Sequence, residues 1–194
     1  PVHHVTALGR CHSDSDKTAT TKIHIGAKLD FKGFIKAGID FIYEKCIKEG
    51  PTDNVNSGDD TQIGSSGYLA KIGSSGDGAQ IGSSGYGAQI GSSGYGAQIG
   101  SSGDLAKIGS SGDLAKIGSS GYLAKIESEG NNAVVAAIGI DSKIKAKKGS
   151  WITLAEYGED LKPVCVRSAQ IDGKSLKEDV FYQLKGGEFV EAAE

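Results

Sequence analysis

The feature that most constrains this chain is a nine-residue repeat, copied without change at residues 81–89 and 90–98 as IGSSGYGAQ. Isoleucine recurs every nine residues from Ile63 to Ile126, and alanine recurs with the same spacing from Ala70 to Ala133. Seven units read I-G-S-S-G-(Y/D)-(L/G)-A-(K/Q), and degenerate units extend the array over about residues 54–148. A fixed short period indicates an architecture in which each unit is one building block.

Within each unit the A-K-I-G-S segment alternates, with alanine, isoleucine and the first serine on one side, which is typical of a strand. The S-G-(Y/D) segment that follows predicts a turn, in which glycine is free to take a positive φ. One unit cannot bury its isoleucine alone, whereas stacked units bury a column of isoleucines. A flexible linker has no reason to keep this spacing. We therefore predict a mainly β fold, a flattened parallel β-solenoid with two units per coil and four to five coils.

The segments that flank the array are predicted to cap its two open edges, which would otherwise template aggregation. We expect an N-terminal α+β cap at 1–53, the β-solenoid at 54–148 and a C-terminal antiparallel β cap at 149–194. In the first cap, strand-like patterns at 2–9 and 19–26 precede an amphipathic helix at 30–49.

The C-terminal cap shows a strand-like alternation in three segments and ends in a short hairpin. These segments are residues 151–157, 163–171 and 181–184, and the last strand is EFVE. We expect the large side chains Trp151, Phe181, Tyr182 and Phe189 to form the core of this cap.

The overall composition excludes several classes of protein. The net charge is −3 and the isoelectric point is about 5.8, so the chain has no general basic footprint and direct nucleic-acid binding is not expected. No apolar run approaches the length that a membrane span needs, and no signal peptide is visible. Three widely spaced cysteines indicate reduced thiols rather than a disulfide framework. We expect a cytoplasmic protein, inside a bacterial host cell, with no membrane contact.

The C-terminal segment GSWITLAEY…IDGKSLKEDVFYQLKGGEFVEA resembles the end of a loose family of hypothetical phage and prophage proteins. Their short-period, glycine-rich β-solenoids close with W-x-x-L-A-E…DG-x-x-[IL]-K-x-D-x-[WF]-Y-x-L-x-x-G-x-F-V-E. The segment SDSDKTATTKIHIGAKLDFKGFIKAGIDFI is similar to the region that precedes their solenoid. The resemblance implies this architecture. A phage origin further implies a small accessory protein that blocks a host defence complex, as anti-CRISPR proteins do.

No pattern in the sequence predicts a catalytic, cofactor or metal site. The cluster His3, His4, Cys11 and His12 fits no closed zinc spacing, and Cys165 lies in an apolar strand with no histidine after residue 24. Calcium-binding β-rolls also use nine-residue repeats. Here, however, the position after the second glycine is Asp in some units and Tyr in others, which a fixed ligand position does not allow. We therefore expect no enzyme activity, no cofactor and no metal.

The tyrosine or aspartate position is the candidate contact surface for a protein partner. With two units per coil, these residues form one column along each corner of the solenoid. Exposed aromatic side chains beside glycine provide contact area at low entropic cost, although a role in covering the isoleucine core explains them equally well. The candidate partner-binding residues are Tyr68, Asp77, Tyr86, Tyr95, Asp104, Asp113 and Tyr122.

The resemblance, together with the lack of a catalytic pattern, favours a phage-encoded protein that binds and inhibits a bacterial defence complex, with Cas proteins as the most concrete target. One alternative is a structural or glycan-facing accessory of a virion or cell surface. A second alternative is an enzyme whose site lies in the N-terminal cap. Association into a homodimer through a flat face or the C-terminal cap is the favoured oligomeric state.

Overall fold

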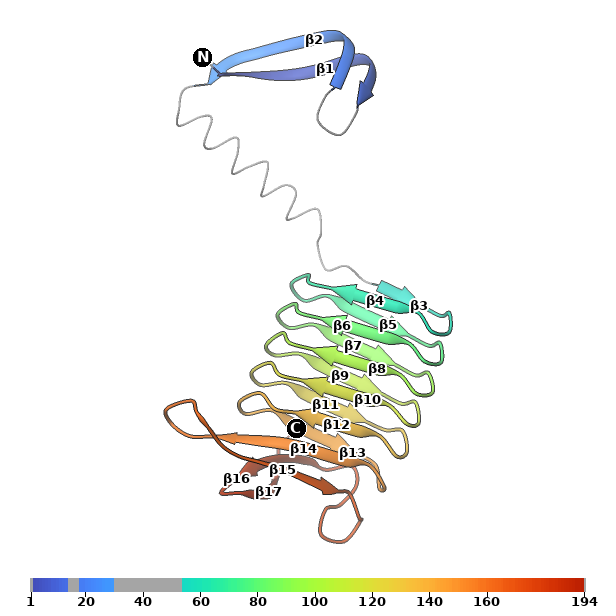
Figure 1. Cartoon of the computed structure of the whole chain (residues 1–194), viewed down its shortest axis with the longest axis vertical. Coiled ribbons are helices and arrows are strands. Elements are labelled where there is room, and N and C mark those ends of the chain that lie inside the picture. The colour runs from blue at the N-terminus through green and yellow to red at the C-terminus, as the bar shows by residue number, and fades with distance from the viewer. Residues whose placement is uncertain (1, 14–17, 30–53, 194) are drawn as a thin grey trace. The chain divides into compact units, whose positions relative to one another are not determined.

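A computed structural model describes residues 2–13, 18–29 and 54–193 of the chain, with side chains described for 54–193. The chain divides into two compact units, residues 1–49 and 50–194. In the first unit, β1 (Val2–Ser13) and β2 (Thr18–Leu29) form an antiparallel hairpin with two register shifts (Figure 1). The two strands expected there are confirmed and are longer than predicted. The helix expected at 30–49 lies outside the described residues.

The second unit is a parallel β-solenoid built from two stacked sheets, as predicted (Figure 1). The solenoid strands of the seven-stranded sheet are β4 (Gln62–Ser65), β6 (Gln80–Ser83), β8 (Gln98–Ser101), β10 (Lys116–Ser119), β12 (Val134–Ala137) and β14 (Trp151–Tyr157). Those of the eight-stranded sheet are β3 (Asn54–Asn56), β5 (Lys71–Ser74), β7 (Gln89–Ser92), β9 (Lys107–Ser110), β11 (Lys125–Ser128) and β13 (Lys143–Ala146).

The register of the parallel strands confirms two units per coil. Ile81 pairs with Ile99 in one sheet and Ile72 pairs with Ile90 in the other, so each residue stacks on the residue 18 positions later. Six strands stack in each sheet, with a last step of 17 residues from Val134 to Trp151, so the predicted four to five coils were too few. The difference arises because β3, β13 and β14 continue the stacks beyond the nine units on which the prediction was based.

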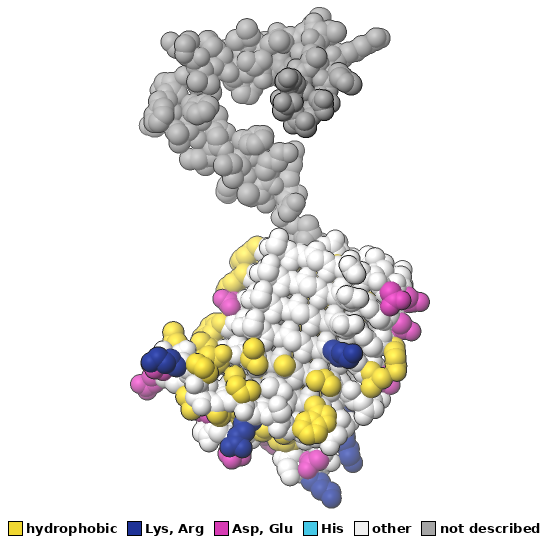
Figure 2. Space-filling view, in the orientation of Figure 1, with side chains coloured by type: hydrophobic (Ala, Val, Ile, Leu, Met, Phe, Trp, Pro, Cys, Tyr) yellow, Lys and Arg dark blue, Asp and Glu magenta, His cyan; other side chains and the backbone are white. Residues whose placement is uncertain are grey.

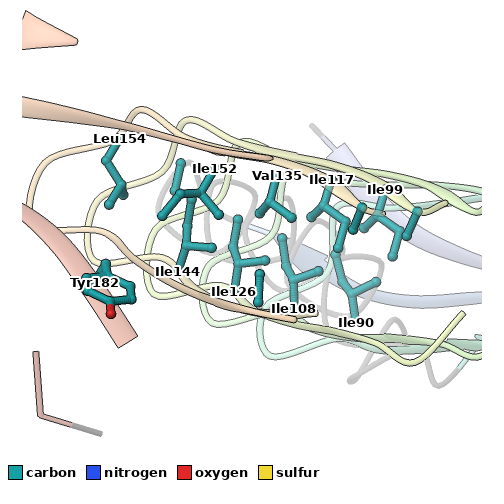
Figure 3. Close-up of a cluster of buried hydrophobic side chains, with 14 of the residues drawn as sticks. Ile90, Ile99, Ile108, Ile117, Ile126, Val135, Ile144, Ile152, Leu154 and Tyr182 are labelled. Carbon is teal, nitrogen blue, oxygen red and sulfur yellow. The ribbon is translucent and has the colours of Figure 1, made fainter. Parts of the chain in front are cut away.

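The core is a double column of isoleucines filled in with alanine. Along the array the isoleucines from Ile72 to Ile126 are at most 3% exposed, and the alanines of the repeat are completely buried. Figure 3 shows the isoleucines of the two sheets facing each other in two rows, which end in Ile152 and Ile144. The first serine of each unit points inward, as predicted, because it lies two residues after the isoleucine on the same side of the strand.

The corners of the solenoid depend on glycine in a way that the sequence did not predict. The positive φ occurs at the Leu/Gly position, for example at Leu105 (φ 56°) and Gly96 (φ 67°), and not at the glycine of S-S-G. The S-S-G glycine is needed for close packing instead. A Cβ at Gly94 would lie 1.9 Å from the carbonyl oxygen of Gly76 in the preceding coil. Only a residue without a side chain fits there at the normal spacing of coils.

The C-terminal cap extends both sheets with antiparallel strands. β15 (Pro163–Gln170) pairs with β14, while β16 (Phe181–Lys185) pairs with β13 and β17 (Glu188–Ala192) pairs with β16. Phe181 and Tyr182 are buried as expected, but Trp151 is half exposed, so its expected place in the core was wrong. It pairs with Val134 at the outward Lys/Gln position of the stack, and the register of the repeat turns it outward.

Two carboxylates hold the loops of this cap. The amides of Gly186 and Gly187 each donate to Glu156, with N–O distances of 2.7 Å. The hydrogen bonds from Gly187 and then Gly186 lower the pKa of Glu156. Asp172 accepts hydrogen bonds from three successive amides at residues 174–176, which likewise lower its pKa. Within the described residues, no helix is long and apolar enough to cross a membrane.

Candidate interaction surfaces

The structure places the seven candidate residues in two columns, one along each corner of the solenoid. Backbone hydrogen bonds fix this arrangement, because the amide of each Leu/Gly residue donates to the carbonyl of the corner residue in the next coil. The Leu69 amide donates to Tyr86, and the Gly78 amide donates to Tyr95, both at 2.8 Å. One column contains Tyr68, Tyr86, Asp104 and Tyr122, and the other contains Asp77, Tyr95 and Asp113.

The tyrosines of these columns are exposed, at 65% for Tyr68, 47% for Tyr86, 55% for Tyr95 and 45% for Tyr122. The rings of Tyr68 and Tyr86 stack with their centroids 5.6 Å apart and an interplanar angle of 5°. The ladder of backbone hydrogen bonds holds the main chain beneath these side chains. Tyr68, Tyr86 and Tyr122 share one corner, and Tyr95 lies on the other.

The aspartates of the same columns have a structural function. The carboxylate of Asp77 accepts a hydrogen bond from the Tyr95 amide at 2.7 Å, and that of Asp104 accepts one from the Tyr122 amide at 2.8 Å. The carboxylate of Asp113 likewise accepts a hydrogen bond from the Asn131 amide in the next coil. Each aspartate therefore joins two coils at the corner. This hydrogen bond was not predicted, because the partner amide lies 18 residues away along the chain.

The outer faces of the two sheets differ in charge, which was not anticipated. The outward Lys/Gln position of the seven-stranded sheet holds Gln62, Gln80 and Gln98, and Lys116 is the one charged residue in β4, β6, β8 and β10. In the eight-stranded sheet the same position holds Lys71, Gln89, Lys107, Lys125 and Lys143. In the view of Figure 2, the repeats present a broad surface with very few charged side chains. Counting every second unit of the repeat would have revealed this difference.

Three lysines gather around one aromatic ring where the eight-stranded sheet meets the cap. The ammonium groups of Lys125, Lys143 and Lys145 lie 4.6, 5.3 and 5.2 Å from the centroid of the Phe181 ring. Lys145 also forms an ion pair with Glu127. The ring face is attractive to cations, so this arrangement holds several positive charges close together at the end of the lysine column.

Residues considered for catalysis and metal binding form no site in the described part of the chain. Cys165 is half-buried against the core, and its thiol donates to Glu156 at 3.6 Å. The side chains of His3, His4, Cys11 and His12 lie outside the described residues. Among the described residues there is no group of three His, Cys, Asp or Glu side chains placed to hold a metal ion.

No protein-family model, curated protein or solved structure matches this chain.

Proposed function

We propose that this protein is a non-catalytic, protein-binding module that contacts its partner through the tyrosines on the corners of the solenoid. The observation that carries the proposal is the exposure of four tyrosines on backbone held by a continuous hydrogen-bond ladder. Tyrosine is enriched at protein interfaces because it offers a large contact area and loses little conformational entropy on binding. A preorganised surface lowers the cost of association further.

The proposed partner is a defence complex of a bacterial host cell, with a complex of Cas proteins as the first candidate. This choice is supported by the resemblance of the cap sequence to phage and prophage proteins. The repetitive surface of the solenoid, on a backbone held by hydrogen bonds between coils, supports an inhibitor that acts by occupying the surface of a larger assembly.

The test is affinity capture with tagged protein from bacterial lysates that contain defined defence systems. The matched variant carries Tyr86→Asp and Tyr122→Asp, because aspartate occupies the same position in other units and forms the corner hydrogen bond there. The control variant carries Lys116→Gln, which places on β10 the glutamine that β4, β6 and β8 carry at the same position. We expect a stoichiometric, identified defence complex with the parent and the control, and its loss with the tyrosine variant. Capture of no defence complex, or equal capture by all three proteins, would refute the proposal.

We also propose that the chain forms a homodimer through the outer edge of β15. In the described part of the chain this strand pairs only with β14, and its outward residues Val164 and Val166 are more than half exposed. An unpaired edge with apolar side chains favours strand pairing with another chain. Sedimentation equilibrium should show a dimer that Val166→Lys converts to a monomer. A monomeric parent protein at high micromolar concentration would contradict this proposal.

A further inference from the structure

A groove runs along the outer face of the eight-stranded sheet. Its floor is formed by Gly73, Gly91 and Gly109, and its volume is about 570 Å³ on the side of the lysine column. Val55 lies at one end and Glu127 at the other. One wall consists of Lys71, Gln89, Lys107 and Lys125, and the opposite side is lined by Ser75, Ser93 and Ser111.

The glycines of this floor are not required by the fold. A Cβ at Gly91 would meet nothing within 4 Å, and one at Gly109 would meet only the Ile90 carbonyl, at 4.0 Å. In the following strands the same column holds Glu127 and Lys145, so side chains are accommodated there. This contrasts with the corner glycines, which the packing of coils demands. A floor without side chains allows the backbone of another chain to approach the sheet closely.

The groove is cationic along most of its length. Three of the four wall residues are lysines. Lys107 and Lys125 lie on neighbouring strands, about 4.8 Å apart, and Gln89 lies between Lys71 and Lys107. Like charges on directly opposed positions of neighbouring strands destabilise a sheet, so an anionic ligand would relieve this repulsion. The carboxylates in the lining are those of Glu127, which pairs with Lys145, and Glu129. Both stand at one end, so the cationic part of the groove extends over the preceding coils.

We infer that this groove binds an extended acidic polypeptide segment of a partner protein. From Val55 to Glu127 the groove crosses four strand spacings, about 19 Å, which matches about six extended residues at 3.3 Å each. A single-stranded nucleic acid is a poorer fit, because sites for it combine positive charge with aromatic stacking platforms and the residues lining this groove include no aromatic ring. The inference rests on the proposed protein-binding function and names a second contact, separate from the tyrosine corners.

The experiment is a fluorescence anisotropy titration of fluorescein-labelled hexaglutamate with the full chain at low ionic strength. We expect saturable binding that weakens as salt is added. Lys107→Gln together with Lys125→Gln should weaken binding about tenfold. Glutamine is the alternative residue of the repeat at this position, so the fold is expected to tolerate both changes. Lys116→Gln, on the opposite face, is the matched control and should change the affinity less than twofold.

A second pair of variants tests the floor of the groove without changing any charge. Gly91→Val fills the groove and should weaken hexaglutamate binding at least tenfold. Gly100→Val makes the same change on the opposite face, where a Cβ also meets nothing within 4 Å, and should leave binding unchanged. Valine favours strands, so circular dichroism should show both variants folded.

Several outcomes would overturn the inference. They are the absence of saturable binding, an equal loss of affinity in the control variants, or equal or tighter binding of labelled hexathymidylate, which would assign the groove to polyanions in general. Failure of the groove to bind hexaglutamate can be distinguished from failure of the proposed protein-binding function. Loss of partner capture on tyrosine substitution, with no hexaglutamate binding, would leave the proposed function intact and remove only the groove.

Discussion

The two glycines of one repeat unit, Gly91 and Gly94, should respond to the same substitution with opposite signs. Gly94→Ala introduces a Cβ at 1.9 Å from the Gly76 carbonyl oxygen, a separation that must grow to at least 3.0 Å. Gly91→Ala introduces a Cβ that meets nothing within 4 Å. The residues lie three positions apart, so the comparison isolates the packing between coils from the general properties of glycine.

The cost at Gly94 follows from the hydrogen bonds beside it. Moving the two coils apart by about 1 Å would break the bond from the Ser93 amide to Ser74 (3.0 Å) and that from the Gly78 amide to Tyr95 (2.8 Å). Each contributes about 0.5–1.5 kcal/mol, and the restriction of the unfolded chain by alanine returns about 0.5 kcal/mol. We expect Gly94→Ala to lower the free energy of unfolding by up to about 2 kcal/mol. Gly91→Ala should raise it by about 0.5 kcal/mol, because glycine is unfavourable within a strand.

Thermal and urea unfolding, followed by far-ultraviolet circular dichroism, measure both effects. For a chain of this length, about 2 kcal/mol corresponds to a decrease in Tm of roughly 4–8 °C. Because each coil interacts only with its neighbours, amide hydrogen exchange should increase mainly in the coils that contain Gly76 and Gly94. Gly94→Ala with parental stability, or an equal loss for both variants, would refute the assignment of the corner glycines to close packing.

Three further substitutions test the core, the buried hydroxyls and the cap. Ile108→Ala should lower the free energy of unfolding by about 2–4 kcal/mol, because Ile108 is only 2% exposed, and a loss below about 1 kcal/mol would contradict its place in the isoleucine column. Ser110→Ala should raise the free energy of unfolding in urea by up to about 1 kcal/mol, because the Ser110 hydroxyl is buried without a hydrogen-bond partner. Alanine is accommodated at this position, since Ala146 occupies it two strands further along the sheet. Destabilisation by Ser110→Ala would refute this expectation. Glu156→Gln should reduce Tm at pH 7 but not in strong acid, because hydrogen bonds from the Gly187 and Gly186 amides lower the pKa of Glu156 in the folded state. Its contribution is complete above the ordinary pKa of 4.5 and disappears as the pH falls through the lowered value, so a difference in Tm that does not depend on pH would count against it.

The solenoid could be predicted because the nine-residue period and the alternation within each unit can both be seen directly in the sequence. The spacing of isoleucine gave the columns, and the alternation around Ile81 gave the inward direction of Ala79 and Ser83, which the burial of these residues confirms. The strand Trp151–Tyr157 was predicted with its observed bounds. Trp151 itself was assigned to the wrong face, because a large aromatic residue suggested a core position although the register of the repeat turns it outward.

The features that could not be predicted are those formed between coils. The hydrogen bond from the Tyr95 amide to the Asp77 carboxylate and the contact of Gly94 with Gly76 both join residues 18 positions apart. A single unit contains neither partner. The groove on the eight-stranded sheet was missed for a related reason, since consecutive units alternate between the two faces and the lysine column appears only when every second unit is read.

This alternation also provides a test of the lysine column that leaves the core composition of each unit unchanged. Deletion of residues 81–98 removes one coil, keeps each remaining unit in its own sheet, and makes Lys71, Lys107 and Lys125 neighbours on one wall. Deletion of residues 81–89 removes one unit and moves every later unit to the other sheet, so Lys71 is separated from Lys107 and Lys125. Both variants should fold, since any two units 18 residues apart can stack. The larger deletion should bind hexaglutamate at least as tightly as the parent, and the smaller one several-fold more weakly. If the smaller deletion bound as tightly as the larger one, the alignment of lysines on one face would not determine the affinity.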